Sequence, residues 1–399
     1  MAQLAPSPIR TPNPEIEATG DELHTFQEAV ARLVRQPQQH LVRVAFYGDS
    51  NLTLDHLSGT LRRELQAKLG DGGHGFLGVG APWRGYRHRD VKRTMVGFWE
   101  TYIFTRGARP RVGGFGAAGM SAASAEPGAK VKFATASADS PVGSRASRLF
   151  VFHHQYQAGG RYRVDIDGQR GDEVNTQGEP EGLVHREFEF EDRAHAFELR
   201  NLDKRFVHLY GLALERSSGV VVDTFAVTGA TYGGIAKLQD EPARRMLRAR
   251  RHDLVIVMLG TNFWNSKENV AGLSALVSRH RTDNPKVGVL VLSPPDHVRS
   301  KGSASSDPRV VAVANELRAA AKELGVAYWD TRAAMGGDGS MREFYQRGLA
   351  GEDLYHLTRE GGDLLGRRLA HALLTSHARY VGTHPQAGCA PQSEKSSGN

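Results

Sequence analysis

The sequence has very little cysteine and no long hydrophobic run. Its single cysteine, Cys389, excludes a disulfide within these 399 residues, and its polar surroundings argue against catalytic thiol chemistry. No stretch approaches the roughly 18 apolar residues of a membrane-spanning helix, and residues 1–15 lack the apolar centre of a signal peptide. A phosphate-binding glycine loop, a metal-spaced Cys/His cluster and an aromatic RNA-binding signature are also missing. We therefore expect a globular protein that uses no metal or other cofactor and does not insert stably into a membrane.

The composition supplies a core and an excess of positive charge. Hydrophobic residues make up 40% of the chain, and the formal net charge is +7. Positive potential concentrates anionic partners, but the arginines are scattered along the sequence. Their densest cluster, residues 244–251, ends an expected helix, where cations favour the helix dipole. We interpret this cluster as a solvated face and expect no nucleic-acid partner, while the oligomeric state stays open.

Apolar runs and helical patterns alternate in two parts of the chain. Residues 41–47 read as a buried strand that ends at Gly48-Asp49-Ser50, and leucines then recur every fourth residue from 57 to 69 until Gly70 ends the helix. This order predicts an α/β fold, a flavodoxin-like parallel sheet with helices on both faces. Further strand-like runs occur at 220–227, 253–260, 286–293 and 326–331, and helical patterns occur at 25–34, 310–324 and 359–374.

The middle of the chain has a different pattern of hydrophobic and polar residues. Short stretches of alternating polarity, separated by Gly, Asp, Ser and Pro, predict a β-sandwich-like insertion, and residues 107–128 predict a long loop within it. The clearest strands are expected at 149–156, 162–166, 188–190 and 207–214. The predicted organisation is a disordered N-terminus (1–20), a discontinuous α/β domain (21–86 and 216–381), an inserted β-rich module (87–215) and a disordered tail (382–399).

Ser50 stands where a nucleophile is expected. Ligands bind beyond the carboxyl ends of strands in open parallel sheets, and a strand, turn and helix place Ser50 at such an end. A helix N-terminus behind it would favour an anion forming on a substrate carbonyl. The alternative is that Asp49 or Ser50 only caps the helix.

Asp353 and His356 provide partners for such a serine. Serine needs a base, and a carboxylate three residues before a histidine can fix the imidazole so that its other nitrogen accepts the serine proton. Alternatively, Asp353 caps the following turn and the histidine is incidental.

The sequence resembles the SGNH/GDSL hydrolases, because four blocks of that family match in order: Gly48-Asp49-Ser50, Gly229, Gly260-Thr261-Asn262, and Asp353 with His356. The resemblance implies a Ser50–His356–Asp353 triad and an oxyanion hole formed by Ser50, Gly229 and Asn262. Gly229 is alternatively a simple turn glycine, with Gly233 or Gly234 as the glycine of the oxyanion hole. Asn262 is alternatively a turn residue. Two positions depart from the family pattern: Asn51 and Phe263.

The long insertion between the first two blocks resembles that of peptidoglycan O-acetylesterases, in which a carbohydrate-binding-like β module interrupts the hydrolase. Residues 70–76 also resemble that subgroup. Aromatic residues of the segment are expected mainly in the core, and adjacent His153 and His154 are expected to be packed or solvated rather than metal ligands. These aromatic residues are Trp83, Trp99, Tyr102, Tyr156 and Tyr162.

The resulting hypothesis is a serine esterase that hydrolyses acyl esters, with O-acetyl groups of a cell-envelope polysaccharide as the expected substrate. The alternatives are an O-acetyltransferase, which would release no free acetate when it transfers, and a non-catalytic glycan-binding protein, which would bind without turnover. The resemblance implies the periplasm or cell envelope, although no signal segment is recognised, so the location stays open.

Overall fold

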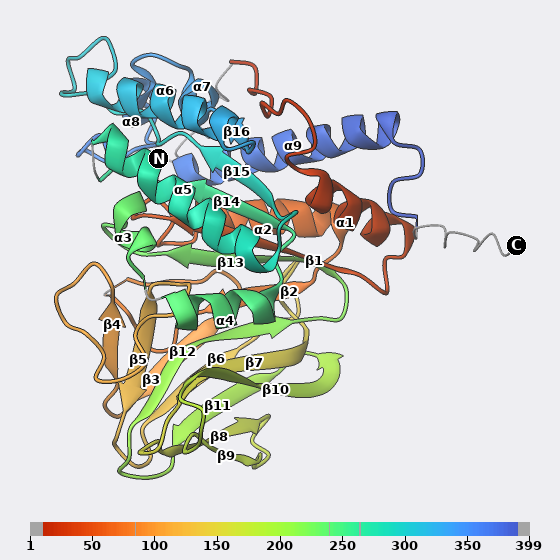
Figure 1. Cartoon of the computed structure of the whole chain (residues 1–399), viewed down its shortest axis with the longest axis vertical. Helices are drawn as coiled ribbons and strands as arrows, with labels where there is room; N and C mark the ends of the chain where they lie inside the picture. The colour runs from red at the N-terminus through yellow and green to blue at the C-terminus, as the bar shows by residue number, and fades with distance from the viewer. Residues whose placement is uncertain (1–10, 84, 239, 263–264, 390–399) are drawn as a thin grey trace, which may run out of the picture.

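The computed structural model describes residues 11–389 except 84, 239, 263 and 264, and its upper layer in Figure 1 is a parallel sheet between helices. The strand order β13-β1-β14-β15-β16 places β1 inside the sheet. The five strands are β1 (Leu41–Gly48), β13 (Gly219–Ala226), β14 (Leu254–Met258), β15 (Gly288–Leu292) and β16 (Ala327–Trp329). The parallel α/β architecture predicted from the alternating pattern is confirmed.

The alternation of side chains along β1 explains why both faces of the sheet are covered. Val44 and Phe46 pack in one core with α1, α2 and α9, whereas Ala45 and Tyr47 pack in another with α3, α4, α5 and α6. The helices of the described residues are α1 (His24–Arg35), α2 (Leu57–Leu69), α3 (Tyr232–Ala236), α4 (Asp240–Arg250), α5 (Ser266–Asp283), α6 (Pro308–Glu323), α7 (Thr331–Met335), α8 (Ser340–Gln346) and α9 (Arg359–Thr383).

Two antiparallel sheets form the lower part of the molecule in Figure 1 and pack on each other through a shared apolar core. One contains β2 (Gly73–Leu77), β4 (Glu100–Ile103), β5 (Met120–Ser124), β7 (Ala146–Gln155), β10 (Gly182–Arg193) and β12 (Val207–Glu215). The other contains β3 (Lys92–Val96), β6 (Lys130–Ala134), β8 (Arg161–Ile166), β9 (Glu173–Asn175) and β11 (Ala196–Asn201). β2 precedes residue 87 but pairs with β12, so the chain enters these sheets before the boundary expected from sequence. The division into domains stays a prediction.

Three sequence expectations are corrected by the structure. The loop expected at 107–128 contains β5, a buried strand between β4 and β12 whose small Ala and Ser side chains give a weak hydrophobic signal. The arginine cluster at 244–251 is not wholly solvated, because Arg250 is fully buried beside Asp223 and Glu215.

The third correction concerns the two termini. Glu17, expected in a disordered segment, pairs with Tyr328, and the Trp329 indole donates to the Pro14 carbonyl at 3.1 Å. At the other end α9 continues to Thr383, and Ala387 is buried with its carbonyl accepting from Arg35 at 2.6 Å. Residues 1–10 and 390–399 lie outside the described residues.

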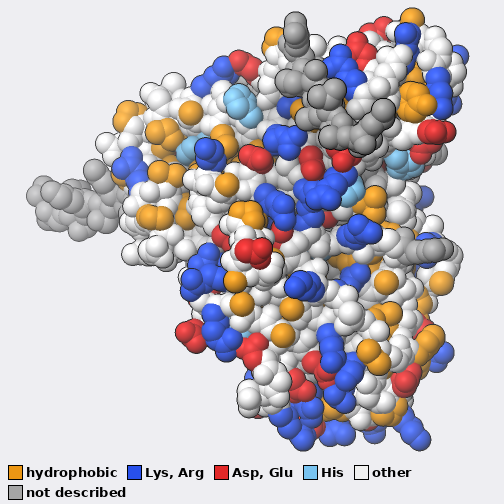
Figure 2. Space-filling view, turned by 180° about the vertical axis from the view of Figure 1, so that it is seen from behind, with side chains coloured by type: hydrophobic (Ala, Val, Ile, Leu, Met, Phe, Trp, Pro, Cys, Tyr) orange, Lys and Arg blue, Asp and Glu red, His pale blue; other side chains and the backbone are white. Residues whose placement is uncertain are grey.

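Charged side chains are distributed over the surface. Figure 2 shows Lys and Arg spread over one face with Asp and Glu between them. Among the described helices, none is long and apolar enough to cross a membrane.

Candidate active site

Three loops meet at the carboxyl edge of the parallel sheet. Gly48, the last residue of β1, is aligned with Ala226 of β13 on one side and with Met258 of β14 on the other. Ser50, Gly229 and Asn262 follow these strand ends within a few residues. The residues expected to form the oxyanion hole therefore lie on loops that start side by side, in the crevice region of an open α/β sheet.

The turn that carries Ser50 is tight and buried. A Cβ atom at Gly48 would lie 2.1 Å from Leu52 Cδ1, so only glycine allows Leu52 to fold back over the strand end. The Leu52 N–H donates to the Asp49 carbonyl at 3.0 Å, and the Asn51 N–H donates to Asp49 Oδ1 at 3.1 Å. Burial raises the pKa of Asp49 to about 6, while the hydrogen bond from the Asn51 N–H opposes the shift. Asp49 thus braces the turn from inside the protein.

The helix after this turn begins at the first leucine of the predicted pattern and not directly behind Ser50. α2 begins at Leu57, its N-cap is His56, and no side chain caps it, so the capping alternative for Asp49 or Ser50 is wrong. Asp55, with a positive φ of 55°, ends the turns that separate Ser50 from the helix. The dipole of α2 therefore does not begin at Ser50, contrary to the sequence interpretation.

His356 lies between Ser50 and Asp353. Its Nε2 is 2.8 Å from Ser50 Oγ, and its Nδ1 is 2.6 Å from Asp353 Oδ2. Asp353 Oδ1 accepts the backbone N–H groups of Tyr355 and His356, each at 3.0 Å, and Leu354 takes a positive φ of 59° to close the loop. The carboxylate therefore holds both the backbone and the ring of His356, and the histidine is not incidental to the turn.

The electrostatics of this pair favour a carboxylate at neutral pH. Partial burial of Asp353 opposes its ionisation, but hydrogen bonds from the His356 ring and from the two backbone N–H groups hold its pKa below the usual range. A charged Asp353 accepts from Nδ1 and leaves Nε2 with a lone pair toward Ser50. This tautomer is the one that can take the serine proton.

Asn51 connects the two loops, a function that sequence reasoning missed. Its Oδ1 accepts the Leu357 N–H at 3.1 Å, so the residue after the serine is tied to the residue after the histidine. Its departure from the family pattern was the only sequence signal at this position. The contact fixes the separation of the two catalytic candidates.

Gly229 has a backbone conformation that favours glycine. Its φ is +75°, and the nearest atom to an added Cβ would be Thr105 Cβ at 3.9 Å, so conformation rather than crowding selects glycine. The rival candidates Gly233 and Gly234 lie within α3, whose N-cap is Thr231. Gly229 remains the predicted oxyanion-hole glycine.

Asn262 lies beside the Gly229 loop. Its Nδ2 donates to the Ala230 carbonyl at 3.1 Å, which orients the carboxamide and leaves its second N–H for another acceptor. Phe263, the other departure from the family pattern, lies outside the described residues.

The remaining candidates from sequence pack within the β-rich part. His153 contacts the Tyr162 hydroxyl at 3.1 Å, and His154 contacts the Tyr210 hydroxyl at 3.0 Å, so both rings have partners in the protein. Among the described residues, no group of three or more His, Cys, Asp or Glu is arranged to hold a metal ion. Trp83, Trp99, Tyr102 and Tyr162 are buried, and Tyr156 is partly buried.

Comparisons with known proteins agree with this architecture. Residues 193–364 match the GDSL-like Lipase/Acylhydrolase family, a segment that includes Gly229, Asn262, Asp353 and His356 but begins after Ser50. A solved peptidoglycan O-acetylesterase is similar over 91% of this chain and 98% of its own, with a TM-score of 0.74 and 20% identity. A family two carbohydrate esterase from Cellvibrio japonicus covers 72% of this chain and 98% of its own at 11% identity, with a TM-score of only 0.31. A comparison with curated proteins gave no match.

The fold and the family match define a carboxylic ester hydrolase. The chain resembles SGNH/GDSL-type acylhydrolases, as its sequence blocks predicted, and its fold is similar to that of a peptidoglycan O-acetylesterase, as its long insertion predicted. These findings support acyl ester hydrolysis as its activity.

Proposed function

We propose that the protein is a serine esterase that removes O-acetyl groups from a cell-envelope polysaccharide, with Ser50 as nucleophile, His356 as general base and acid, and Asp353 as the partner of His356. The observation that supports this most directly is the contact of His356 with Ser50 Oγ at 2.8 Å and with Asp353 at 2.6 Å. A base within hydrogen-bond reach of a serine, itself oriented by a carboxylate, is the arrangement that activates the hydroxyl.

In the proposed reaction Ser50 Oγ bonds to the acetyl carbonyl carbon while its proton moves to His356 Nε2. The bond from that carbon to the sugar oxygen then breaks, and His356 returns the proton to the leaving hydroxyl. Water attacks the acetyl-serine with His356 as base, and acetate leaves as the Ser50 hydroxyl is restored. The imidazolium formed in each half is stabilised by the Asp353 carboxylate.

The negative oxygen that forms in both steps needs hydrogen-bond donors. We assign these to the backbone N–H groups of Ser50 and Gly229 and to the Asn262 carboxamide, which follow the ends of three neighbouring strands. The carboxamide is already oriented by Ala230. Removal of one such donor typically lowers turnover by about a hundredfold.

Two observations support a polymeric acetyl ester as substrate. The side chains of His356 and Asp353 are 50% and 52% exposed, so the reacting groups are open to a chain that extends past them. The similar solved structure is described as a peptidoglycan O-acetylesterase, and its likeness covers 91% of this chain.

The test is release of acid from p-nitrophenyl esters of increasing chain length by the protein and by its Ser50→Ala variant. We expect turnover that is fastest for acetate and at least about a thousandfold lower in the variant. Ser305→Ala, which changes an exposed serine, is the matched control. Turnover by Ser50→Ala at the parent rate would contradict the assignment.

A second assay separates hydrolysis from transfer. Incubation with an O-acetylated glycan should release free acetate in an amount equal to the acetyl lost from the glycan. Acetyl groups recovered on an added sugar acceptor, without free acetate, would instead identify a transferase.

A further inference from the structure

A cavity of about 310 Å³ is lined by the turn after Ser50, by the start of α9 and by strands of the β-rich part. Leu54 and His56 line it from the turn, Arg359 from the first residue of α9, and Phe133 and Leu212 from β6 and β12. Leu54 is four residues from Ser50, a span of at most about 14 Å. A substrate held at Ser50 can therefore extend into the cavity.

The lining is strongly cationic. It includes Arg87, Arg89, Arg93 and Arg359, and among the described residues that line the cavity none is acidic. Asp363, outside the lining, pairs with Arg89 at 2.9 Å and lies 3.9 Å from Arg359. One carboxylate thus serves two of the four guanidinium groups.

Arg93 has only neutral partners. It donates to the carbonyl oxygens of Gly78 at 3.4 Å and Tyr86 at 3.2 Å, and its guanidinium lies 4.5 Å from the centre of the Tyr86 ring. Within the described part of the chain, no carboxylate forms an ion pair with it. Burial lowers the pKa of Arg93. Packing on Tyr86 explains the orientation of the side chain but leaves its charge uncompensated, and a partly desolvated cation gains from an anionic partner.

Arg87 adds a second cation. Its side chain is exposed at the cavity and has no hydrogen-bond or ion-pair partner among the described residues. It requires no rearrangement to meet a ligand, whereas Arg89 is already engaged by Thr60 and Asp363.

We infer that this cavity is a subsite for a carboxylate-bearing sugar of the acetylated glycan, with the carboxylate bound by Arg93 and Arg87. The inference rests on the proposed function. The planar guanidinium matches a carboxylate in a two-point hydrogen-bonded pair. The apolar side of the cavity, formed by Leu77, Val91 and Phe133, offers the face of a sugar ring a surface to pack on. The volume is at the lower end of ligand sites, roughly 300 to 1,000 Å³, and suits one sugar unit.

The first test compares each acidic sugar with its carboxamide. The probes are an O-acetylated hexuronic acid, with the carboxylate on the ring, and O-acetylated N-acetylmuramic acid, with the carboxylate on a side chain. For at least one pair we expect kcat/KM to be about tenfold higher for the acid, a preference that falls as ionic strength rises. The pair that shows the preference identifies the position of the carboxylate.

The second test assigns the preference to the cavity. Arg93→Gln should reduce the acid-to-carboxamide ratio to about one, and Arg93→Lys should restore part of it, because lysine keeps the charge but loses the two-point geometry. If Arg93→Gln does not fold, Arg87→Gln, at an exposed position, should lower the acid-to-carboxamide ratio in the same way. Arg170→Gln, which removes an exposed arginine that does not line the cavity, should leave the ratio unchanged.

The outcomes separate the subsite from the proposed function. Serine-dependent release of acetate at equal rates from acid and carboxamide would overturn the subsite and leave the esterase intact. A preference that persists in both Arg93→Gln and Arg87→Gln would also overturn it. Absence of serine-dependent release from every ester would contradict the proposed function, and the subsite with it.

Discussion

Asp353 makes three hydrogen bonds with its two oxygens, which gives a sharp prediction for Asp353→Asn. The two backbone N–H groups that donate to Oδ1 will donate to the carbonyl oxygen of the new asparagine and fix the orientation of its amide. The NH₂ group will therefore face His356 Nδ1. That donor forces the proton onto Nε2, where it blocks proton transfer from Ser50. We expect kcat for p-nitrophenyl acetate to fall by about 10³ to 10⁴, with the fold retained.

The neighbouring Glu352→Gln variant is the matched control. Glu352 is exposed, and its only ion pair in the described structure is with Lys301 at 3.6 Å. Its kcat should stay within a factor of two or so of the parent. A fall of less than tenfold in Asp353→Asn would show that the tautomer of His356 is not set by Asp353.

At the residue scale, the sequence predicted the contact between the two main catalytic candidates but not the contacts around them. The block order predicted that Ser50 and His356 meet although 306 positions separate them, because each block has a known place in the family fold. The bond from the Leu357 N–H to Asn51 could not be predicted, since it joins a side chain to the backbone of a distant loop. The burial of Arg250 was also hidden, because an arginine-rich helix end reads as solvated.

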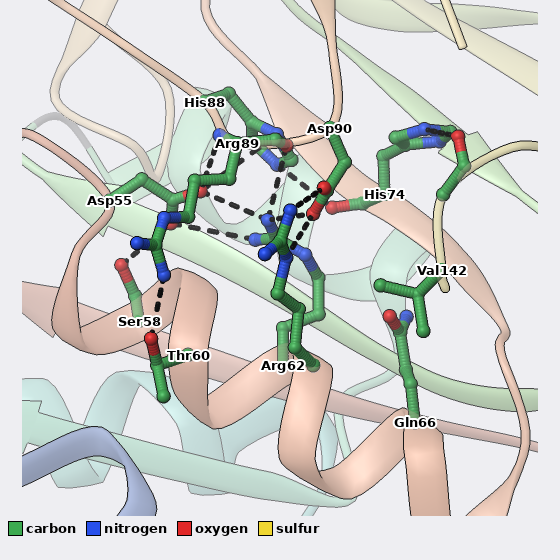
Figure 3. Close-up of polar contacts among 12 residues, drawn as sticks. Asp55, Ser58, Thr60, Arg62, Gln66, His74, His88, Arg89, Asp90 and Val142 are labelled. Carbon is green, nitrogen blue, oxygen red and sulfur yellow. Dashed lines mark hydrogen bonds and ion pairs between the residues drawn. The ribbon is translucent and has the colours of Figure 1, made fainter. Parts of the chain in front are cut away.

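Among the elements, α2 is tied to the segment before β3 by buried ion pairs around Arg62 (Figure 3). Arg62 pairs with Asp55 at 3.0 Å and with Asp90 at 3.2 Å, and Asp55 also accepts the Arg89 N–H at 2.8 Å. Burial alone would raise the pKa of Asp55, but Arg62 and His88 lower it to about 2.

The pKa of Asp55 predicts how Asp55→Asn behaves with pH. Because the folded pKa lies below the usual value of 3.8, the carboxylate stabilises the fold above pH 4, and this stability is lost as pH falls toward 2. We expect Asp55→Asn to lower the free energy of unfolding by about 3 kcal/mol at pH 7, and by about 1 kcal/mol less at pH 3. Urea unfolding at both pH values measures the difference.

The exposed Asp172→Asn variant serves as control and should change stability by less than about 0.5 kcal/mol at either pH. A loss for Asp55→Asn that is the same at pH 7 and pH 3 would refute the ionic explanation.

The contact of α2 with α9 links the two loops of the site. α2 follows the Ser50 turn, α9 follows His356, and a Cβ at Gly366 would lie 2.6 Å from the Leu57 carbonyl oxygen and 2.9 Å from Thr60 Cβ. Gly366→Ala should therefore push the helices apart. We expect a loss of about 1 to 3 kcal/mol in stability and a fall in kcat of about tenfold or more, measured by urea unfolding and ester hydrolysis.

Gly382→Ala is the control on the same helix. No atom lies within 4 Å of its added Cβ, so the change should leave kcat unaltered and be neutral or slightly stabilising. Normal kcat in a destabilised Gly366→Ala would show that the spacing of the helices does not position the triad.

At this scale the sequence predicted the strands of the parallel sheet within two residues, because buried strands read as apolar runs. It missed β5, whose alanine and serine side chains resemble a loop. It also placed a helix N-terminus directly behind Ser50, whereas several turns separate Ser50 from α2, which has no side-chain cap.

Across the whole molecule, the upper and lower layers of Figure 1 meet at a buried ionic cluster. Arg250, at the end of α4, pairs with Asp223 of β13 at 2.7 Å and with Glu215 of β12 at 2.5 Å, and all three side chains are inaccessible to solvent. Asp223 also accepts the Phe76 N–H at 2.8 Å, from β2 of the antiparallel sheet. The change from a helix-and-strand pattern to short alternating stretches predicted an insertion. It did not predict the buried charges that connect this part to the parallel sheet.

Replacement of Arg250 by methionine tests whether this cluster holds the layers together. Methionine fills part of the space but leaves Asp223 and Glu215 facing each other without the cation between them, although Arg43 and His252 stay in contact with one carboxylate each. We expect the free energy of unfolding to fall by about 3 to 5 kcal/mol, measured by urea unfolding at pH 7. Arg248→Met, whose partners lie 3.6 and 3.9 Å away at the surface, should cost less than about 1 kcal/mol. Equal losses of unfolding free energy in the two variants would mean that the buried ion pairs of Arg250 do not stabilise the contact between the layers. Apolar packing alone would then hold the layers together.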